Sequence, residues 1–502
     1  MSALNSHQAS SPIDRRTFIR RSAIAAAGGA VLAGPFQGFL GAATAFAGNP
    51  GAIDYGPLVG IPDHRDGVVR LDLPQGFNYR SFQVTGSPMA SLPGTPIPGR
   101  HDGMAAFAGP RANQYRLVRN HEINGPGAPF GPGAAYDANA RGGCVTVVVD
   151  RHGKVAADMV SLNGTQLNCA GGAMPWGSWV SCEETVNGPD VYDDFTRGSA
   201  PAETYVSNAQ LEKPHGYIFE VPAEGASNML PIRSAGRFAH EAAVADPNSG
   251  QIYMTEDNFG FPSGFYRYDP PNDPTTDGHI DDGGTLWMLK VVGAMNADLS
   301  LGQAPGAAYN VEWVQIGEPD PNFPMAGGLP TVINDHAINA VGQQGRDLGA
   351  ALFSRLEGAY YDRGLVYFVS TQGGAQNSPD SAPSGFGDGR GQVWAYDVGS
   401  STLHLVYESP SAATLDLPDN VVVGRSGTML LCEDGSGDNF LRGLTPEGQI
   451  FDFARNADPA QFGQEFAGAT FSPDFKTLFV NIQSGNGYSL AIWGPWARGG
   501  FG

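Results

Sequence analysis

Short hydrophobic runs recur along the whole chain at close spacing. Typical examples are residues 144–150 (CVTVVVD), 365–370 (LVYFVS) and 477–482 (TLFVNI). Most of these runs are bounded by Gly, Pro, Asn or Asp, which is the turn chemistry of antiparallel strands. Long amphipathic helical patterns are few, whereas glycine accounts for 70 of the 502 residues. The pattern predicts an all-β fold with long inserted loops.

Three of these runs end in the same way. Residues 179–187 (WVSCEETVN), 252–258 (IYMTEDN) and 429–435 (MLLCEDG) each place two carboxylates directly after a hydrophobic strand. Equivalent strand ends converge on one mouth of the central channel in a β-propeller, whereas a sandwich would scatter them. A blade takes about 40 to 50 residues, and the long loops reduce the number of blades that fit. We therefore expect a six-bladed β-propeller.

The aligned carboxylates suggest a cation site. In register, Glu183 precedes Glu184, and the equivalent pairs are Glu256–Asp257 and Glu433–Asp434. Neighbouring strand residues face opposite sides, so one carboxylate of each pair would face the channel. Such residues are commonly solvated or hydrogen bonded to turn amides, but three converging pairs would repel one another unless cations were bound.

Other stretches carry residues suited to the same site. Cys169 lies in a glycine-rich segment and is either a buried apolar residue or a soft ligand for iron or zinc. Glu241 follows His240, and a further strand ends in Glu122. Arg355 precedes Glu357 by two residues, which places both side chains on one face of a strand. The pair is either a structural salt bridge or an arginine that binds an anionic substrate beside a metal-binding glutamate. Such a site suits hydrolysis of an anionic ester.

The charge and the cysteine content of the chain limit the partners and the kind of secreted protein that can be expected. The chain has 29 Lys and Arg against 50 Asp and Glu, a net charge of −21. A nucleic-acid partner is disfavoured, because phosphate backbones bind basic surfaces. Four cysteines in a chain of 502 residues do not form the disulfide framework of a small secreted domain.

The N-terminus predicts export. Arg15 and Arg16 form a twin-arginine pattern, followed by the alanine-rich apolar stretch 23–40 and a small-x-small cleavage site at 45–47. We expect a signal peptide over residues 1–47, recognised by the twin-arginine export machinery, and a single mature domain over residues 48–502. No other stretch approaches the roughly 20 apolar residues of a membrane span, so a secreted or periplasmic product is expected.

Several motifs, taken together and in order, resemble the PhoX family of secreted alkaline phosphatases. They include NHE, NCAGGAMPWGSWVSCEE, GRFAHEAA, YMTED, FSRLEG, PDN, CEDG and EFAGATFSPDFKTLFVNIQ, between about residue 100 and residue 496. The resemblance implies a six-bladed propeller that binds Fe(III) and Ca²⁺ at its channel mouth. It also implies hydrolysis of phosphate monoesters through a metal-bridging oxygen nucleophile.

The resemblance assigns roles residue by residue. Cys169 would be the thiolate ligand of iron, Arg355 would bind the phosphoryl group and stabilise its developing charge, and Asp257 is a further candidate calcium ligand. The remaining carboxylate ligands would be Glu184, Glu241, Glu357 and Asp434. Residues 99–107 (GRHDGMAAF) depart from the Asn/Asp-rich stretch expected before NHE.

Two other functions fit parts of the pattern. A different propeller hydrolase, such as a lactonase or a calcium-dependent phytase, would share the fold and the carboxylates but would leave the Cys169 segment unexplained. A non-catalytic propeller, stabilised by calcium and binding a surface partner, would hold calcium without iron.

Overall fold

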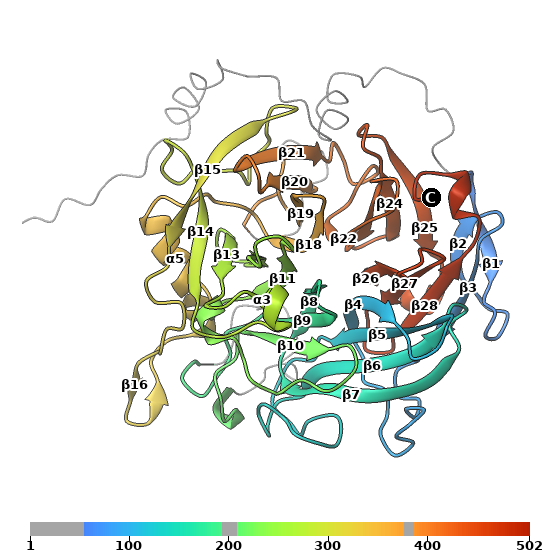
Figure 1. The fold of residues 1–502 in the computed structure, drawn as a ribbon, viewed down its shortest axis with the longest axis horizontal. Coiled ribbons are helices and arrows are strands. Elements are labelled where there is room, and N and C mark those ends of the chain that lie inside the picture. The colour runs from blue at the N-terminus through green and yellow to red at the C-terminus, as the bar shows by residue number, and fades with distance from the viewer. Residues whose placement is uncertain (1–54, 193–207, 376–385) are drawn as a thin grey trace, which may run out of the picture.

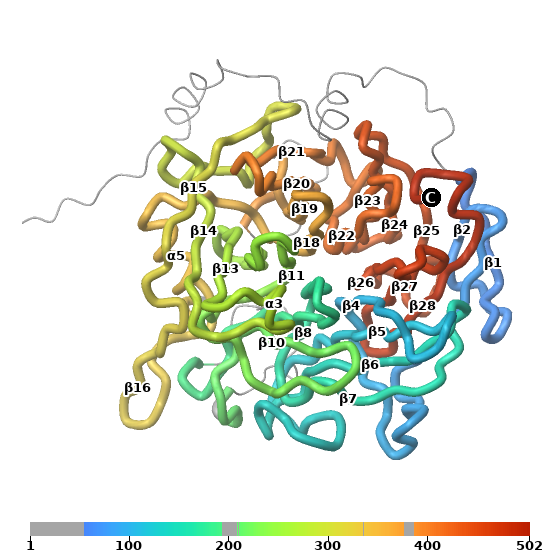
Figure 2. The backbone as a smooth tube through the Cα atoms, in the orientation of Figure 1, coloured from blue at the N-terminus to red at the C-terminus, as the bar shows by residue number. Residues whose placement is uncertain are grey.

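The strands form blades around a central axis. The structure is a computed structural model that describes residues 55–192, 208–375 and 386–502, so the predicted signal peptide lies outside the described residues. Within these ranges the regular elements are almost all strands, arranged as a ring of small twisted sheets (Figures 1 and 2). The all-β propeller predicted from the hydrophobic pattern is confirmed.

Apart from the separate hairpin of β16 (Met325–Ala326) and β17 (Leu329–Pro330), the described strands make six blades, numbered by their order in the chain. The first blade contains β4 (His101–Ala108), β5 (Gln114–His121), β6 (Gly142–Asp150) and β7 (Val155–Thr165), and the second contains β8 (Asn168–Ala173), β9 (Ser178–Glu183) and β10 (Ile218–Pro222). The third contains β11 (His240–Ala245), β12 (Ile252–Glu256), β13 (Phe265–Asp269), β14 (Thr285–Val291) and β15 (Ala308–Gln315). The fourth contains β18 (Leu356–Asp362), β19 (Leu365–Ser370), β20 (Gln392–Asp397) and β21 (Thr402–Glu408).

The last two blades take strands from both ends of the described chain. The fifth contains β22 (Pro418–Val423), β23 (Met429–Glu433), β24 (Phe440–Leu444) and β25 (Ile450–Asn456), extended by β2 (Val69–Pro74) and β1 (Leu58–Pro62). The sixth contains β26 (Phe466–Phe471), β27 (Thr477–Ile482), β28 (Tyr488–Trp493) and β3 (Asn78–Phe82). Because β3 pairs antiparallel with β28, hydrogen bonds between distant parts of the chain close the ring.

Blade packing explains the continuous hydrophobic runs in the sequence. All six residues of β19 are buried, because each face of this blade packs against a neighbouring blade. A strand buried on both faces has no polar face, so it reads as an apolar run and not as an alternating one. In the part of the chain that the structure describes, helices are short, and the longest is α5 (Ala340–Asp347). Among the described residues, no helix has both the length and the apolar character that crossing a membrane requires.

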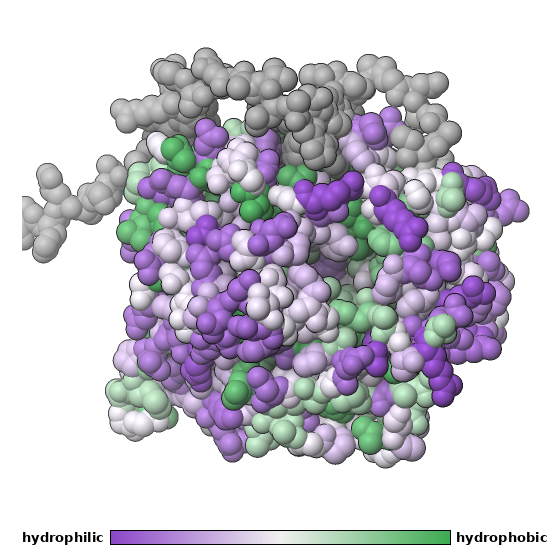
Figure 3. Space-filling model, in the orientation of Figure 1, coloured by the Kyte–Doolittle hydropathy of each residue, from purple (hydrophilic) through white to green (hydrophobic). Residues whose placement is uncertain are grey.

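The innermost strands of the blades surround a central channel. These strands (β4, β8, β11, β18, β22 and β26) each contact the next around the ring. Small residues permit this approach: a Cβ added to Gly358 would lie 2.7 Å from the Cα of Asn420 on the adjacent innermost strand. The channel holds a cavity of about 330 Å³, lined largely by glycine, alanine and other apolar residues of the six strands. The space-filling view shows the surface hollowed near its middle (Figure 3).

Candidate metal centre

A backbone hydrogen bond repeats in all six blades at one end of the channel. In each blade, the residue that follows the second strand donates its N–H to the carbonyl of the residue that precedes the innermost strand, over 2.9 to 3.2 Å. The six donor residues are Glu122, Glu184, Asp257, Thr371, Asp434 and Gln483. The repeat seen in three strand ends of the sequence is therefore sixfold. It belongs to the second strand of each blade, not to the strand that lines the channel.

A second ring comes from the innermost strands themselves. The first residue of each innermost strand pairs with the last residue of the second strand, and a β-bulge follows in every blade. The second residues of the six innermost strands are Asp102, Cys169, Glu241, Glu357, Asp419 and Ala467. Five blades thus contribute an acidic or thiol side chain at equivalent positions. Cys169 occupies the place that a carboxylate takes in four other blades.

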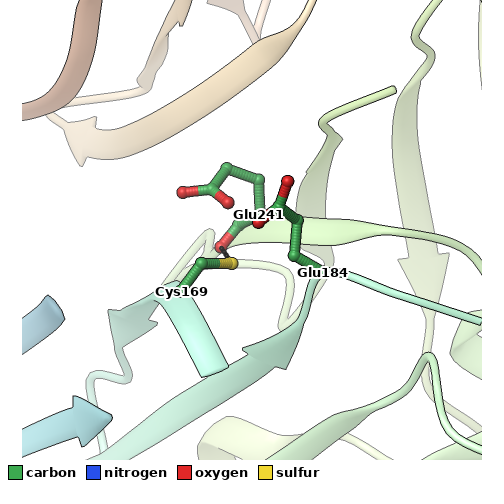
Figure 4. Close-up of side chains that lie close together, drawn as sticks. All are labelled: Cys169, Glu184 and Glu241. Atoms are coloured by element: carbon green, nitrogen blue, oxygen red, sulfur yellow. Dashed lines mark hydrogen bonds between the residues drawn. The ribbon is translucent and has the colours of Figure 1, made fainter. Parts of the chain in front are cut away.

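The two rings bring candidate ligands together in two groups. The ligand atoms of Cys169, Glu184 and Glu241 lie within 4.8 Å of one another, and so do those of Glu241, Glu357 and Asp419. Figure 4 shows the first group, with side chains that come from the start of β8, from the residue after β9 and from β11. Glu241 is common to both groups, so it could bridge two bound ions.

Glu183 lies outside both groups of candidate ligands, and its carboxylate is hydrogen bonded within the fold. It is fully buried. One carboxylate oxygen lies 2.6 Å from Nδ1 of His215 and accepts the N–H of Gln166 at 2.9 Å. The other oxygen accepts the N–H of Gly216 at 2.8 Å. Glu183 therefore fixes the segment that leads into β10, and the neighbouring Glu184 is the residue of this pair that joins the candidate ligands.

The equivalent residues of two other blades repeat this arrangement. Glu256 accepts the N–H of Gly264, just before β13, at 2.9 Å. Glu433 accepts the N–H of Phe440, at the start of β24, at 3.0 Å, and Nε of Arg442 donates to it at 2.8 Å. The first carboxylate of each Glu–Glu or Glu–Asp pair thus anchors the third strand of its blade. This division of roles follows from the alternation of side chains along a strand.

Arg355 lies beside the candidate ligands and is held by two of the predicted site residues. Its Nε and Nη2 donate to Asp257 at 3.1 and 2.7 Å, and Nη2 also donates to Glu357 at 2.7 Å. Among the described residues, none makes a hydrogen bond to Nη1. Asp257 is not part of either group of candidate ligands. Its assignment as a calcium ligand stays a prediction, and its observed partner is Arg355.

Burial and mutual repulsion make this pocket unfavourable for ionised carboxylates. Burial and nearby acidic groups raise the pKa of Asp419 to about 7 and that of Asp434 to about 6, although Arg355 opposes both shifts. Burial and the neighbouring carboxylates also raise the pKa of Glu241 and of Glu357 well above the ordinary range. The pKa of the Cys169 thiol is raised by burial and by Glu241. Bound cations would remove this penalty.

Three carboxylates that lie beside the candidate ligands were not predicted from the sequence as part of the site. Asp102 and Asp419 belong to the inner ring, and Glu465 is a neighbour of Asp419 and Asp434 that shares their electrostatic environment. A repeated triplet at the start of each innermost strand could have revealed the inner ring. Its first residue varies, its second is Asp, Glu, Cys or Ala, and its third is a small residue or Asn. The triplets are HDG, NCA, HEA, LEG, PDN and FAG. Residues 99–107, which depart from the expected motif, supply Asp102.

Comparison with known proteins gives the same family as the motifs. The sequence model of the alkaline phosphatase PhoX family matches residues 53–160 and 151–486. No curated protein sequence matches the chain. Among solved structures, PhoX from Pseudomonas fluorescens in complex with vanadate is similar, with a TM-score of 0.60 and 18% identity over 89% of this chain and 98% of that one.

Other solved structures are more distant. The gluconolactonase XC5397 from Xanthomonas campestris gives a TM-score of 0.39 and 13% identity over 88% of this chain and 98% of that chain. Virginiamycin B lyase from Staphylococcus aureus gives a TM-score of 0.36 and 12% identity over 83% and 99%. The family match covers most of the described residues and includes every candidate ligand. The chain belongs to the alkaline phosphatase PhoX family.

Proposed function

We propose that the protein is a metal-dependent phosphatase that hydrolyses phosphate monoesters at the end of the propeller channel where the two rings lie. The observation that supports this most is the arrangement of Cys169 and a ring of buried carboxylates beside Arg355. The family match supports the phosphatase activity. The solved relative from Pseudomonas fluorescens is described in complex with vanadate, a transition state analogue, which is the ligand class expected for phosphoryl transfer.

The donor set fits two kinds of cation. A thiol beside two carboxylates, as in Cys169, Glu184 and Glu241, suits a transition metal, and we assign Fe(III) to this group. An all-carboxylate group, as in Glu241, Glu357 and Asp419, suits Ca²⁺, which prefers oxygen ligands. Burial and the neighbouring Asp434 raise the pKa of Asp419 to about 7, which supports a bound cation at this position. Asp434 and Asp257 stay candidate ligands at the edge of the site.

The chemistry expected of the bound ions is polarisation of the phosphate ester and activation of the oxygen that attacks phosphorus. The protein groups then have two tasks. Arg355 presents Nη1 to the phosphoryl oxygens, held in place by Asp257 and Glu357, and so stabilises charge that develops on them. The buried carboxylates would hold the cations away from bulk water.

The ring also contains a hydroxyl group that could be considered as a nucleophile. Thr371 occupies the fourth-blade position of the outer ring. Its hydroxyl donates to the carbonyl of Pro418 at 2.6 Å, and it is fully buried. A side chain committed in this way is poorly placed to attack phosphorus. We therefore do not assign the nucleophile to Thr371.

We also propose that the mature protein is a single domain over residues 48–502. Residues 1–47 would be removed as a twin-arginine signal, which places the enzyme in the periplasm or outside the cell. The acidic charge of −21 is compatible with small phosphate esters as substrates once cations neutralise the site. Nucleic acid is not an expected partner.

The proposal is tested with protein purified without chelators. Hydrolysis of p-nitrophenyl phosphate is compared with that of bis(p-nitrophenyl) phosphate and of gluconolactone, for wild type and for Arg355→Ala. We expect hydrolysis of the monoester, with kcat/KM reduced at least about 100-fold in the variant. Lactone hydrolysis alone would favour the lactonase alternative. Calcium binding without hydrolysis of any of these substrates would favour the non-catalytic propeller.

A further inference from the structure

An exposed aromatic ring stands next to the arginine assigned to the phosphoryl group. Phe259 lies two residues after Asp257, in the turn between β12 and β13. Its side chain is 47% exposed. Cζ of Arg355 lies 5.6 Å from the centroid of the ring, within the range of a cation–π contact. The guanidinium of Arg355 is therefore contacted by an apolar ring that is open to solvent.

Hydrogen bonds fix the backbone of the turn that carries the ring. Asn258 is 1% exposed, and its N–H donates to Oγ of Ser263 at 3.1 Å. Oδ1 of Asn258 accepts the N–H of Phe261 at 3.2 Å. The carbonyl of Phe259 accepts the N–H of Phe386 at 2.8 Å. A backbone fixed at these points lowers the entropy that the ring would lose on contacting a ligand.

Burying a phenylalanine side chain stabilises a protein by roughly 1.5 to 3 kcal/mol relative to exposure. A phenyl ring that stands on an anchored backbone and yet is half exposed is therefore a candidate contact for a ligand. A phosphate bound at Nη1 of Arg355 would direct its ester oxygen and the attached alcohol group away from the buried carboxylates, toward solvent. Phe259 contacts this same guanidinium, whose Nε and Nη2 already donate to Asp257 and Glu357.

We propose that Phe259 is a specificity-determining residue that contacts the alcohol part of the ester and favours aromatic alcohols. The inference rests on the proposed phosphatase function and on the role of Arg355 in it. Stacked or edge-to-face ring pairs stabilise a complex beyond the burial of area alone. The substrate class is then phosphate monoesters whose alcohol carries an aromatic ring close to the ester oxygen.

The test separates binding from reactivity. Dissociation constants of phenylphosphonate and methylphosphonate, which are not hydrolysed, are measured by isothermal titration calorimetry for wild type, Phe259→Ala and Phe259→Tyr. In Phe259→Ala we expect binding of phenylphosphonate to weaken about threefold to tenfold, and binding of methylphosphonate to change less than about twofold. Phe259→Tyr keeps the ring and should restore the preference.

A matched control and a second readout complete the test. Leu348 is 49% exposed and directly follows α5, a helix on the outer edge of the ring of blades (Figure 1). Leu348→Ala should therefore leave both constants unchanged. The ratio of kcat/KM for phenyl phosphate to that for glycerol 2-phosphate should fall in Phe259→Ala. An unchanged ratio, or an equal loss of affinity for both phosphonates, would overturn the proposed role of Phe259 and leave the proposed phosphatase function standing. If the wild type hydrolyses neither ester, the proposed function fails, and this inference fails with it.

Discussion

Glu183 and Glu184 are adjacent in the chain but have different roles in the fold. The Glu183 carboxylate is enclosed by His215 and by backbone amides, whereas the Glu184 carboxylate lies with Cys169 and Glu241. The same division separates Glu256 from Asp257 and Glu433 from Asp434. One carboxylate of each pair builds the blade, and the other belongs to the ring at the end of the channel.

The first prediction separates these two roles by substitution. Glu183→Ala leaves His215 and the Gly216 amide without their buried partner, so the free energy of unfolding should fall by about 3 kcal/mol or more. Glu184→Gln should instead reduce the bound metal with little change in unfolding of the metal-free protein. Urea denaturation and elemental analysis measure the two effects. Equal loss of stability in both variants would contradict the division.

The second prediction concerns Asp257, whose observed partner is Arg355. If Asp257 positions the guanidinium, Asp257→Asn should lower kcat/KM about 10-fold or more while the metal content stays that of wild type. Loss of calcium in the variant would show that Asp257 is a ligand instead. Asp246→Asn is a suitable control, since Asp246 makes its hydrogen bonds in the turn between β11 and β12 and to the hydroxyl of Tyr361, and none of them to Arg355.

The third prediction is a pH dependence of stability from His215. Although burial disfavours its charge, the nearby carboxylates of Glu183 and Asp137 raise the pKa of His215 from 6.5 to about 8. A folded-state pKa above the unfolded value stabilises the fold below pH 6.5, and this contribution is lost as the pH rises through 8. The shift corresponds to about 2 kcal/mol.

This dependence is measured as the difference in free energy of unfolding between wild type and His215→Gln. The difference should be largest near pH 6 and should shrink toward pH 9. A difference that stays constant over this range would mean that His215 does not change its charge there.

The fourth prediction concerns removal of the metals. In the metal-free protein the pKa values of Asp419 and Asp434, about 7 and about 6, exceed their ordinary value of 3.8. Raised carboxyl pKa values mean that the metal-free fold loses stability as the pH rises from about 4 through 7. Chelated protein should therefore have a lower Tm at pH 8 than at pH 5.5, and added calcium should restore more at pH 8. A Tm at pH 8 that does not respond to calcium would argue against the site.

The sequence alone predicted the propeller and part of its site. The turn-bounded hydrophobic runs gave the all-β architecture, and the three Glu–Glu or Glu–Asp endings gave the convergence on one end of the channel. The sixfold repeat could not be recognised in the sequence, because the equivalent positions in two blades are Thr371 and Gln483, which are not acidic. Which carboxylate of a pair faces the site could not be decided, since that depends on how each strand sits in its blade.

The inner ring was harder to predict for a different reason. Asp102 and Asp419 are brought beside Glu241 and Glu357 only by closure of the ring of blades, and their flanking sequences share little more than a small residue or Asn after the acid. The contact between Arg355 and Asp257 joins two blades in the same way. Local patterns describe single blades, whereas the site forms between them.

The central claim is that Cys169 and the buried carboxylates hold iron together with calcium. The most direct test is elemental analysis by inductively coupled plasma mass spectrometry of wild type and Cys169→Ala, both exported and purified without chelators. We expect stoichiometric iron and calcium in the wild type, and loss of iron with calcium retained in the variant. Iron that is retained in Cys169→Ala, or a wild type that holds calcium alone or no stoichiometric metal, would contradict it.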